Sequence, residues 1–429
     1  MADPSFTVPH LETSLRGPLL YLEQQFLSHQ QQIETWLNEQ WTITRAPLYG
    51  SVDCRNAGFK IAPIDTNIFP AGWNNLDTAT LPQCAAAAKT VLSRLCPDAT
   101  RLLIVPESHS RNLAYFENIN TLKHILTLAG YEVCIGTTDP HIQQSQEITL
   151  PSGESLTLHP LKRTKDTVYI DSLKPSAIIL NNDLSNGIPE TLKNITQPIL
   201  PAMQFGWTKR LKSEHFGFYQ QVAEEFASQI EIDPWLINPL FDQCPEVDFM
   251  QRAGQECIQT RATALFHRIQ QKYDEYNITH PPFLVIKADQ GTYGMAVMVV
   301  RSAKELESLN RKQRTRMSSS KGGRKVTRAI IQEGVYSFET MNNNAVAEPV
   351  VYLFGHHVVG GFYRVHKNKG SDENLNAPGM NFTPLAFANS GDPSGETESI
   401  NRFYTYGVIS QLAMLAAARE LHAFKGQTK

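Results

Sequence analysis

A lysine at the end of an apolar run, followed closely by a glycine-containing turn, is the most informative feature of this sequence. The run Phe283-Leu-Val-Ile leads to Lys287, and Gln290-Gly-Thr-Tyr-Gly294 comes soon after it. The apolar run predicts a strand, and the two glycines allow a tight turn whose N–H groups point at anionic oxygens. With a second strand predicted over Met295 to Val300, the segment is typical of a phosphate-binding loop. An ordinary hairpin whose lysine reaches solvent explains this segment alone equally well.

A second cation is positioned by another predicted hairpin. The apolar runs 347–354 and 358–365 are joined by Gly355-His-His357. Period-2 alternation along the second run places Phe362, Arg364 and His366 on one face. A guanidinium held in this way can bind a phosphoryl group or a carboxylate through two parallel hydrogen bonds. The alternative is an arginine at a strand edge in solvent.

The elements that must position these groups alternate between helix and strand. The patterns predict helices over 81–95 and 112–129 and strands over 101–105, 131–136 and 177–180. This order predicts a parallel sheet, with the polar interval 137–165 as a surface excursion. Residues 201–278 are mostly helical by pattern, and Pro281-Pro282 precedes the strand that carries Lys287. We therefore predict an N-terminal α/β substrate-binding domain over 1–200 and a second module over 201–429.

Composition excludes several classes of protein. The chain has 429 residues, 41% of them hydrophobic and 19% charged, which is typical of a globular protein with a large core. A net charge of −3 gives no overall attraction to nucleic acid or anionic membranes. The six cysteines form no C-x-x-C pair, which predicts reduced thiols rather than a zinc site. Without a leader or a long apolar run, we predict a cytoplasmic protein that binds neither membrane nor nucleic acid.

Four features resemble, in their order, the ATP-grasp superfamily. They are the lysine strand before a glycine loop, the strand ending in Gln332-Glu333, the hairpin with Arg364, and the acidic and asparagine residues of 372–376 and 396–401. The resemblance implies an α/β fold with an N-terminal parallel-sheet domain and a C-terminal ATP-grasp module of two α+β subdomains that close on ATP and Mg²⁺. Lys287 and Arg364 are then the catalytic residues, with Arg364 steadying an acyl phosphate. The nucleotide-binding residues implied are Lys287, Gln290, Gly291, Thr292, Tyr293, Gly294, Gln332, Glu333 and Val335.

The metal ligands implied by this resemblance depart from the usual pattern. The superfamily supplies a terminal Glu-x-Asn pair, whereas this chain offers Glu396, Glu398 and Asn401 within Glu-Thr-Glu-Ser-Ile-Asn. Oxygen ligands of this kind suit Mg²⁺. Asn374 lies in Glu-Asn-Leu-Asn, which is similar to the loop that follows the corresponding arginine in glutathione synthetase.

Four longer segments resemble one family within this superfamily. They are 53–75, Asn181-Asn-Asp-Leu-Ser-Asn-Gly187, 287–295 and Asn401-Arg-Phe-Tyr-Thr-Tyr-Gly407. Together they are similar to the proteobacterial glutamate–cysteine ligases whose fold is related to glutathione synthetase. The resemblance implies ATP-dependent joining of the glutamate γ-carboxylate to the cysteine amine, the first step of glutathione biosynthesis. Another ATP-grasp amide ligase, such as a glutathione synthetase, is the nearest alternative.

Polar residues in two regions are candidates for binding the amino-acid substrates. An arginine fork suits an α-carboxylate and an aspartate suits an α-ammonium group, and both occur in the Pro- and Gly-rich stretch 53–75. A second polar segment follows the strand 102–105, at the edge where open parallel sheets bind ligands. The predicted substrate-binding residues are Arg55, Lys60, Asp65, Asn67, Asn74, Ser110 and Arg111. A surface loop capped by its own side chains is the alternative for the first stretch.

Two basic segments allow further interpretations. Trp207-Thr-Lys-Arg-Leu-Lys212 predicts a helix start whose Lys209 or Lys212 faces the nucleotide. Residues 311–325 carry seven Lys or Arg side chains among Ser and Gly. This segment fits a lid over ATP or a solvated loop, and it also supports a nucleotide-dependent RNA-binding protein as the alternative from another class. The oligomeric state does not follow from the sequence.

Overall fold

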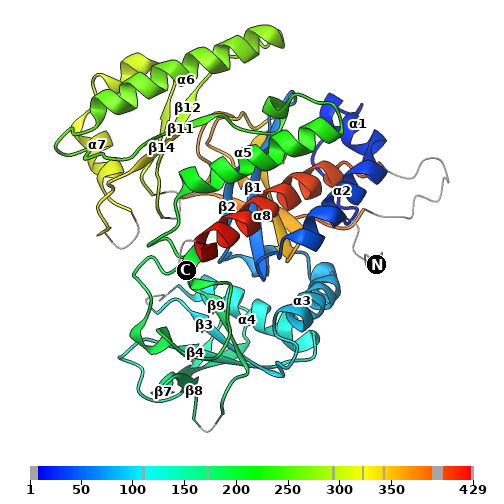
Figure 1. The fold of residues 1–429 in the computed structure, drawn as a ribbon, viewed down its shortest axis with the longest axis vertical. Coiled ribbons are helices and arrows are strands. Elements are labelled where there is room, and N and C mark those ends of the chain that lie inside the picture. The colour runs from blue at the N-terminus through cyan, green and yellow to red at the C-terminus, as the bar shows by residue number, and fades with distance from the viewer. Residues whose placement is uncertain are drawn as a thin grey trace.

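The computed structural model contains three larger sheets, each within its own lobe of the chain (Figure 1). It describes residues 8–108, 112–171, 173–291, 295–320, 323–341, 344–388 and 400–426. The lobe with β3, β4 and β9 lies at one end of the molecule, the lobe with β12, β14 and α6 lies at the other, and α8 runs through the middle. The mixed α/β fold predicted from the sequence is confirmed.

The central sheet joins strands from opposite ends of the sequence. Its order is β18-β17-β16-β1-β2, with the short β15 also paired to β16, and every pairing is antiparallel. The strands are β1 (Tyr49–Asn56), β2 (Ile61–Asn67), β15 (Thr340–Met341), β16 (Ala345–Phe354), β17 (His357–His366) and β18 (Asn381–Pro384). Because β1 pairs with β16, these pairings cross the boundary predicted at residue 200. The division into 1–200 and 201–429 is therefore not confirmed.

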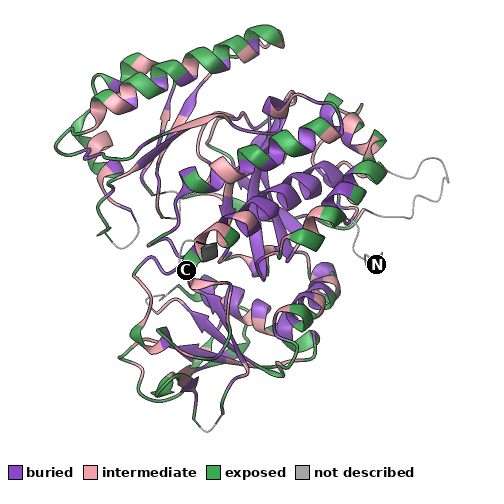
Figure 2. Cartoon of the chain, in the orientation of Figure 1, coloured by how far each residue is buried: buried purple, intermediate pink, exposed green. Residues whose placement is uncertain are grey.

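Helices cover the central sheet. Against β1, β2, β16 and β17 packs α8 (Phe403–Gly426), whose run of alanines lets helix and sheet approach closely. Around α8 lie α1 (Tyr21–Ser28), α2 (Gln30–Ile43) and α5 (Lys212–Gln229). Figure 2 shows α8 buried along most of its length. Within the described residues, no helix is long and apolar enough to cross a membrane.

The predicted parallel sheet is confirmed. Its order is β10-β9-β3-β4-β6-β5, and only the edge strand β5 runs antiparallel to its neighbour. The strands are β3 (Arg101–Pro106), β4 (Glu132–Thr137), β5 (Gln146–Thr149), β6 (Ser155–Pro160), β9 (Ala177–Asn181) and β10 (Ile199–Leu200), with α3 (Leu81–Leu95) and α4 (Leu113–Leu128) alongside. The interval 137–165 lies largely at the surface, as predicted, but it also forms β5 and β6. Leu156 and Leu158 are buried because β6 extends the sheet.

The third sheet carries Lys287 and has the order β11-β14-β12-β13. Its strands are β11 (Phe241–Cys244), β12 (Leu284–Ala288), β13 (Val297–Val300) and β14 (Ala329–Glu333), with α6 (Gln255–Glu275) packed against it. The helix α7 (Arg311–Ser318) occupies the first half of the basic segment 311–325. An antiparallel pairing of β12 with β13 confirms the predicted hairpin around the glycine loop.

The remaining regular elements are short. A hairpin of β7 (Lys162–Thr164) and β8 (Thr167–Tyr169) stands apart from the three sheets. The 3-10 helices span Trp73–Asn75, Thr78–Thr80, Glu190–Leu192, Met203–Phe205, Pro234–Leu236 and Ala303–Leu306. Cys244 on β11 and Cys257 on α6 form a disulfide, so the prediction of reduced thiols is wrong for this pair. The sequence had no signal for it because strand and helix meet only in the fold.

Candidate active site

A cleft of about 770 Å³, including space open to solvent, lies where the central sheet faces the third sheet, and its lining mixes apolar with charged side chains. One wall comes from β1, β2, β16 and β17, and the other comes from β12, β13 and β14. The start of α5, the loop 372–376 and the residues Gly291, Met295 and Val335 complete the lining. The charged side chains that line it are Asp53, Arg55, Asp65, Lys212, Lys287, Glu333, Glu348, Arg364, Asp372 and Glu373.

Two lysines enter the cleft from different elements. Lys287 on β12 is half-buried, and its Nζ donates hydrogen bonds to Ile64 O and Gln332 Oε1, each at 2.8 Å. Burial lowers the pKa of Lys287 to about 8, although nearby Asp65 favours the charged form. Lys212 begins α5, where its Nζ lies 2.6 Å from Asp65 Oδ1 and 4.3 Å from the centre of the Trp207 ring. Two cations thus flank one carboxylate.

Two carboxylates face each other on neighbouring strands. Asp53 on β1 and Asp65 on β2 are register partners, and β-sheet geometry brings such side chains within a few ångströms when they point to one face. Burial raises the pKa of Asp53, and the negative charges of Asp65 and Glu348 add to that effect against the opposing pull of Arg364. For Asp65, burial also raises the pKa, but Lys212 and Lys287 outweigh it and hold the pKa below its usual value.

A buried network of two arginines and one glutamate forms the floor of the cleft. Glu348 on β16 accepts from Arg55 Nε at 2.8 Å and from Arg364 Nη1 at 2.6 Å. The same Arg364 Nη1 lies 3.1 Å from Asp53 Oδ2, while Arg364 Nε is buried without a hydrogen-bond partner. Arg55 also donates to the carbonyl oxygens of Val335 at 3.1 Å and Glu373 at 2.5 Å. Arg55 therefore ties the loop 372–376 to the sheet.

Comparison with known proteins identifies the family. The sequence profile of GshA, described as glutamate-cysteine ligase, matches residues 23–421. The chain belongs to the glutamate-cysteine ligase family. A solved structure from Methylobacillus flagellatus KT, a candidate gamma-glutamylcysteine synthetase, is 49% identical with a TM-score of 0.86, covering 98% of this chain and 100% of that one. The ligase function predicted from the sequence is thereby confirmed. No curated protein matches the chain significantly.

More distant solved structures resemble this ligase only weakly. A D-alanyl-alanine synthetase A from Vibrio cholerae is 10% identical with a TM-score of 0.33, covering 74% of this chain and 81% of that one. A glutathione synthetase-like effector from Globodera pallida is also 10% identical, with a TM-score of 0.38 and coverages of 86% and 84%.

The cleft of this ligase contains many of the residues predicted from its sequence. Lys287, Arg364, Gly291, Gln332, Glu333, Val335, Arg55 and Asp65 all line it, as does Asn374. Gln290 lines a neighbouring cavity, and Asn67 lies two residues beyond Asp65 at the end of β2. Ser110, Arg111, Thr292, Tyr293, Gly294, Glu396 and Glu398 lie outside the described residues.

Three predicted residues lie elsewhere in the ligase. The Lys60 ammonium is buried 2.8 Å from Glu333 Oε2 and 4.2 Å from the centre of the Trp235 ring, so it supports the sheet edge behind the cleft. Asn74 is exposed in a 3-10 helix next to α4. Asn401 donates to the carbonyl oxygen of Pro9 at 3.2 Å and holds the N-terminal segment.

The sequence reasoning omitted Asp53 and Glu348 and did not commit to Lys212. A usable signal existed for Glu348, because a carboxylate inside an otherwise apolar strand is rarely buried without a partner. Glu348 follows Ala-Val-Ala and precedes Pro-Val-Val-Tyr, whereas Asp53 lies among other polar residues. What no local pattern reveals is that these carboxylates share one cleft, since β1 and β16 are far apart in sequence.

A divalent cation would need oxygen ligands in this cleft. Among the described residues, no group of three or more His, Cys, Asp or Glu side chains forms a ready-made metal site. Asp53 and Asp65 nevertheless fit Mg²⁺, which usually binds one or two protein carboxylates together with substrate phosphates and water. Burial is the main cause of the raised pKa of Asp53, and the nearby carboxylates of Asp65 and Glu348 add negative charge that a cation would offset.

Proposed function

We propose that the cleft binds ATP and Mg²⁺ and that the glutamate γ-carboxylate is activated there as an acyl phosphate. The observation that carries the proposal is the convergence of Lys212, Lys287 and Arg364 around Asp53 and Asp65 in one cleft. Cations suit a polyphosphate, and two carboxylates suit the metal that accompanies it. The ATP-grasp resemblance of the glycine loop supports the same conclusion.

The reaction then proceeds in two steps, phosphoryl transfer followed by attack of the amine. An oxygen of the glutamate γ-carboxylate attacks the γ-phosphorus of ATP, and the bond to the β-phosphate oxygen breaks to release ADP. The cysteine nitrogen next attacks the acyl carbon, the carbon–oxygen bond to phosphate breaks, and the amine loses a proton to solvent. Phosphate and γ-glutamylcysteine are the products, which makes this the first step of glutathione biosynthesis.

The residues contribute mainly by positioning and charge. Lys287 and Lys212 would offset the negative charge of the transferring phosphoryl group, since both reach the cleft and neither needs to move a proton. Arg364 would stabilise the oxyanion that forms when the amine attacks, using donors other than the one held by Glu348. Mg²⁺ held by Asp53 and Asp65 would supply further neutralisation at the phosphate oxygens. Arg55 keeps the loop 372–376 in place.

The test is ADP release from Mg²⁺-ATP with glutamate, with and without cysteine, together with detection of the dipeptide. We expect dipeptide only when both amino acids are present, and ADP in equal amount. Release that is independent of both amino acids would contradict the proposal. The cytoplasmic location and the absence of nucleic-acid binding stay predictions.

A further inference from the structure

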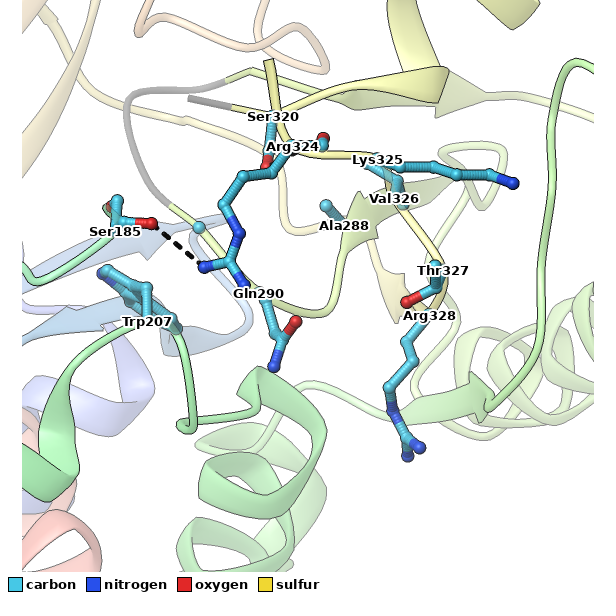
Figure 3. Close-up of a pocket in the computed structure, with 11 residues that line it drawn as sticks. Ser185, Trp207, Ala288, Gln290, Ser320, Arg324, Lys325, Val326, Thr327 and Arg328 are labelled. Carbon is cyan, nitrogen blue, oxygen red and sulfur yellow. Dashed lines mark hydrogen bonds between the residues drawn. The ribbon is translucent and has the colours of Figure 1, made fainter. Parts of the chain in front are cut away.

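A second cavity of about 380 Å³, including space open to solvent, lies beside the main cleft (Figure 3). Ala288 and Gly291 line both cavities, so the start of the glycine loop forms the wall between them. The other lining residues come from the segment 324–328, from Ser320, and from Ser185 and Trp207 near the parallel sheet. A ligand in this cavity would therefore lie next to the group bound by the glycine loop.

The two cavities differ in charge. The main cleft has six Asp or Glu side chains in its lining, whereas the described lining of the second cavity has none. It has three cationic residues instead: Arg324, Lys325 and Arg328. The main cleft thus suits a cation accompanied by phosphates, and the second cavity suits a free anion.

Of the three cations, Arg324 alone has no carboxylate partner among the described residues. Lys325 Nζ is 2.6 Å from Asp248 Oδ2, and Arg328 Nε is 3.5 Å from Asp289 Oδ2. Arg324 forms no ion pair with any described residue, and its Nη1 donates only to Ser185 O at 3.0 Å. Figure 3 shows Arg324 extending between Ser185 and Gln290, while Lys325 extends the opposite way.

The backbone holds Arg324 close to the glycine loop. Ser319 and Lys325 form an antiparallel bridge, and Ser320 N donates to Arg324 O at 2.8 Å. Gly291 has φ +105°, and a Cβ at this position would lie 3.3 Å from Ser320 Cβ. The absence of a side chain on Gly291 therefore lets the segment carrying Arg324 pack against the glycine loop.

We propose that this cavity binds the α-carboxylate of an amino-acid substrate, with Arg324 as the specificity-determining residue. The inference rests on the proposed function, in which both amino acids carry an α-carboxylate that takes no part in bond formation. A guanidinium binds such a planar anion through parallel hydrogen bonds, and Gln290 and Ser320 add neutral donors at the same wall. Either glutamate or cysteine can supply the carboxylate.

The test compares Arg324→Gln with the wild-type enzyme on paired substrates. Cysteamine is cysteine without its carboxylate, and 4-aminobutyrate is glutamate without its α-carboxylate. We expect Arg324→Gln to lower kcat/KM for one natural amino acid about 10- to 100-fold, the usual effect of one charge-assisted hydrogen bond, and to leave its truncated analogue unchanged. The pair that responds identifies the bound substrate. Where an analogue is not turned over, its inhibition constant replaces kcat/KM.

Two further variants separate charge from structure. Arg316→Gln removes the same charge from an exposed position of α7 outside the cavity and should behave as wild type. Arg324→Lys should restore part of the difference in kcat/KM between the natural amino acid and its truncated analogue. If Arg324 acted only by packing, restoring the charge would not restore this difference.

Four outcomes would overturn the proposal. Equal losses for an amino acid and its analogue would make Arg324 structural, and a rise confined to the KM for ATP would assign the cavity to phosphate. Wild-type kinetics in Arg324→Gln would remove the subsite while leaving the proposed function intact. A wild-type enzyme that makes no γ-glutamyl product would instead refute the proposed function, and this inference with it.

Discussion

Replacing Lys287 with methionine should separate catalysis from stability. Methionine keeps a long unbranched chain but removes the ammonium that lies between Ile64 O and Gln332 Oε1. Losing one preorganised contact to the transferring phosphoryl group costs roughly 3 kcal/mol of transition-state stabilisation, which is about a hundredfold in kcat/KM for ATP. The cost to folding should be small, because both acceptors are neutral oxygens and no buried charge is left without its partner.

Lys60→Met is the matched control. Lys60 is another lysine whose pKa burial lowers to about 8, but its partner is the buried carboxylate of Glu333. Removing it leaves that charge with only the Trp235 and Leu240 N–H donors, so we expect a loss of about 3 to 5 kcal/mol in the free energy of unfolding. Lys287→Met should therefore lose activity, whereas Lys60→Met should lose stability.

The assay combines steady-state ADP release with urea denaturation of both variants. Two results would refute this role of Lys287. The first is that Lys287→Met keeps kcat/KM for ATP within about threefold of wild type, and the second is that its unfolding free energy falls as far as that of Lys60→Met. In the first case Lys287 does not contact the nucleotide. In the second case its hydrogen bonds hold the two sheets together, and the lost activity would be a consequence of misfolding.

Four other predictions follow from the same site. Because the pKa of Lys287 is lowered to about 8, kcat/KM for ATP should fall as pH rises through 8. Lys287→Arg should move that fall to higher pH, and a Lys287→Arg profile equal to that of wild type would show that Lys287 does not cause it. Asp65→Asn should raise the Mg²⁺ concentration for half-maximal activity at least tenfold, measured at fixed ATP, and no change would place the metal elsewhere. Gly291→Ala should lower kcat, because φ is +105° there and Ser320 is close, while circular dichroism stays native; full activity would show that the loop tolerates a side chain. Glu420→Gln should lower the free energy of unfolding by about 3 kcal/mol, since Arg210 is buried against it, and a stability within about 0.5 kcal/mol of wild type would refute this.

Local pattern predicted the elements that carry the proposed nucleotide site. Lys287 ends an apolar run before two glycines, and this pattern correctly indicated a hairpin because strand periodicity and turn chemistry are properties of adjacent residues. The parallel sheet followed in the same way from helices alternating with strands. The prediction for 137–165 missed β6, because this strand is half polar and only its position in the sheet makes Leu156 and Leu158 core residues.

The sequence by itself determined the family, the activity and the cationic residues Lys287 and Arg364 as members of one site. Only the tertiary structure decided which carboxylates lie beside these two cations. Asp53 and Asp65 reach the cleft because β1 pairs with β16, and Val52 opposes Val351 across that ladder. Pairing between segments so distant in sequence depends on the burial of both faces of the central sheet, which no local pattern records. The N-terminal strands therefore supply Asp53 and Asp65 to a site whose cations come largely from the rest of the chain.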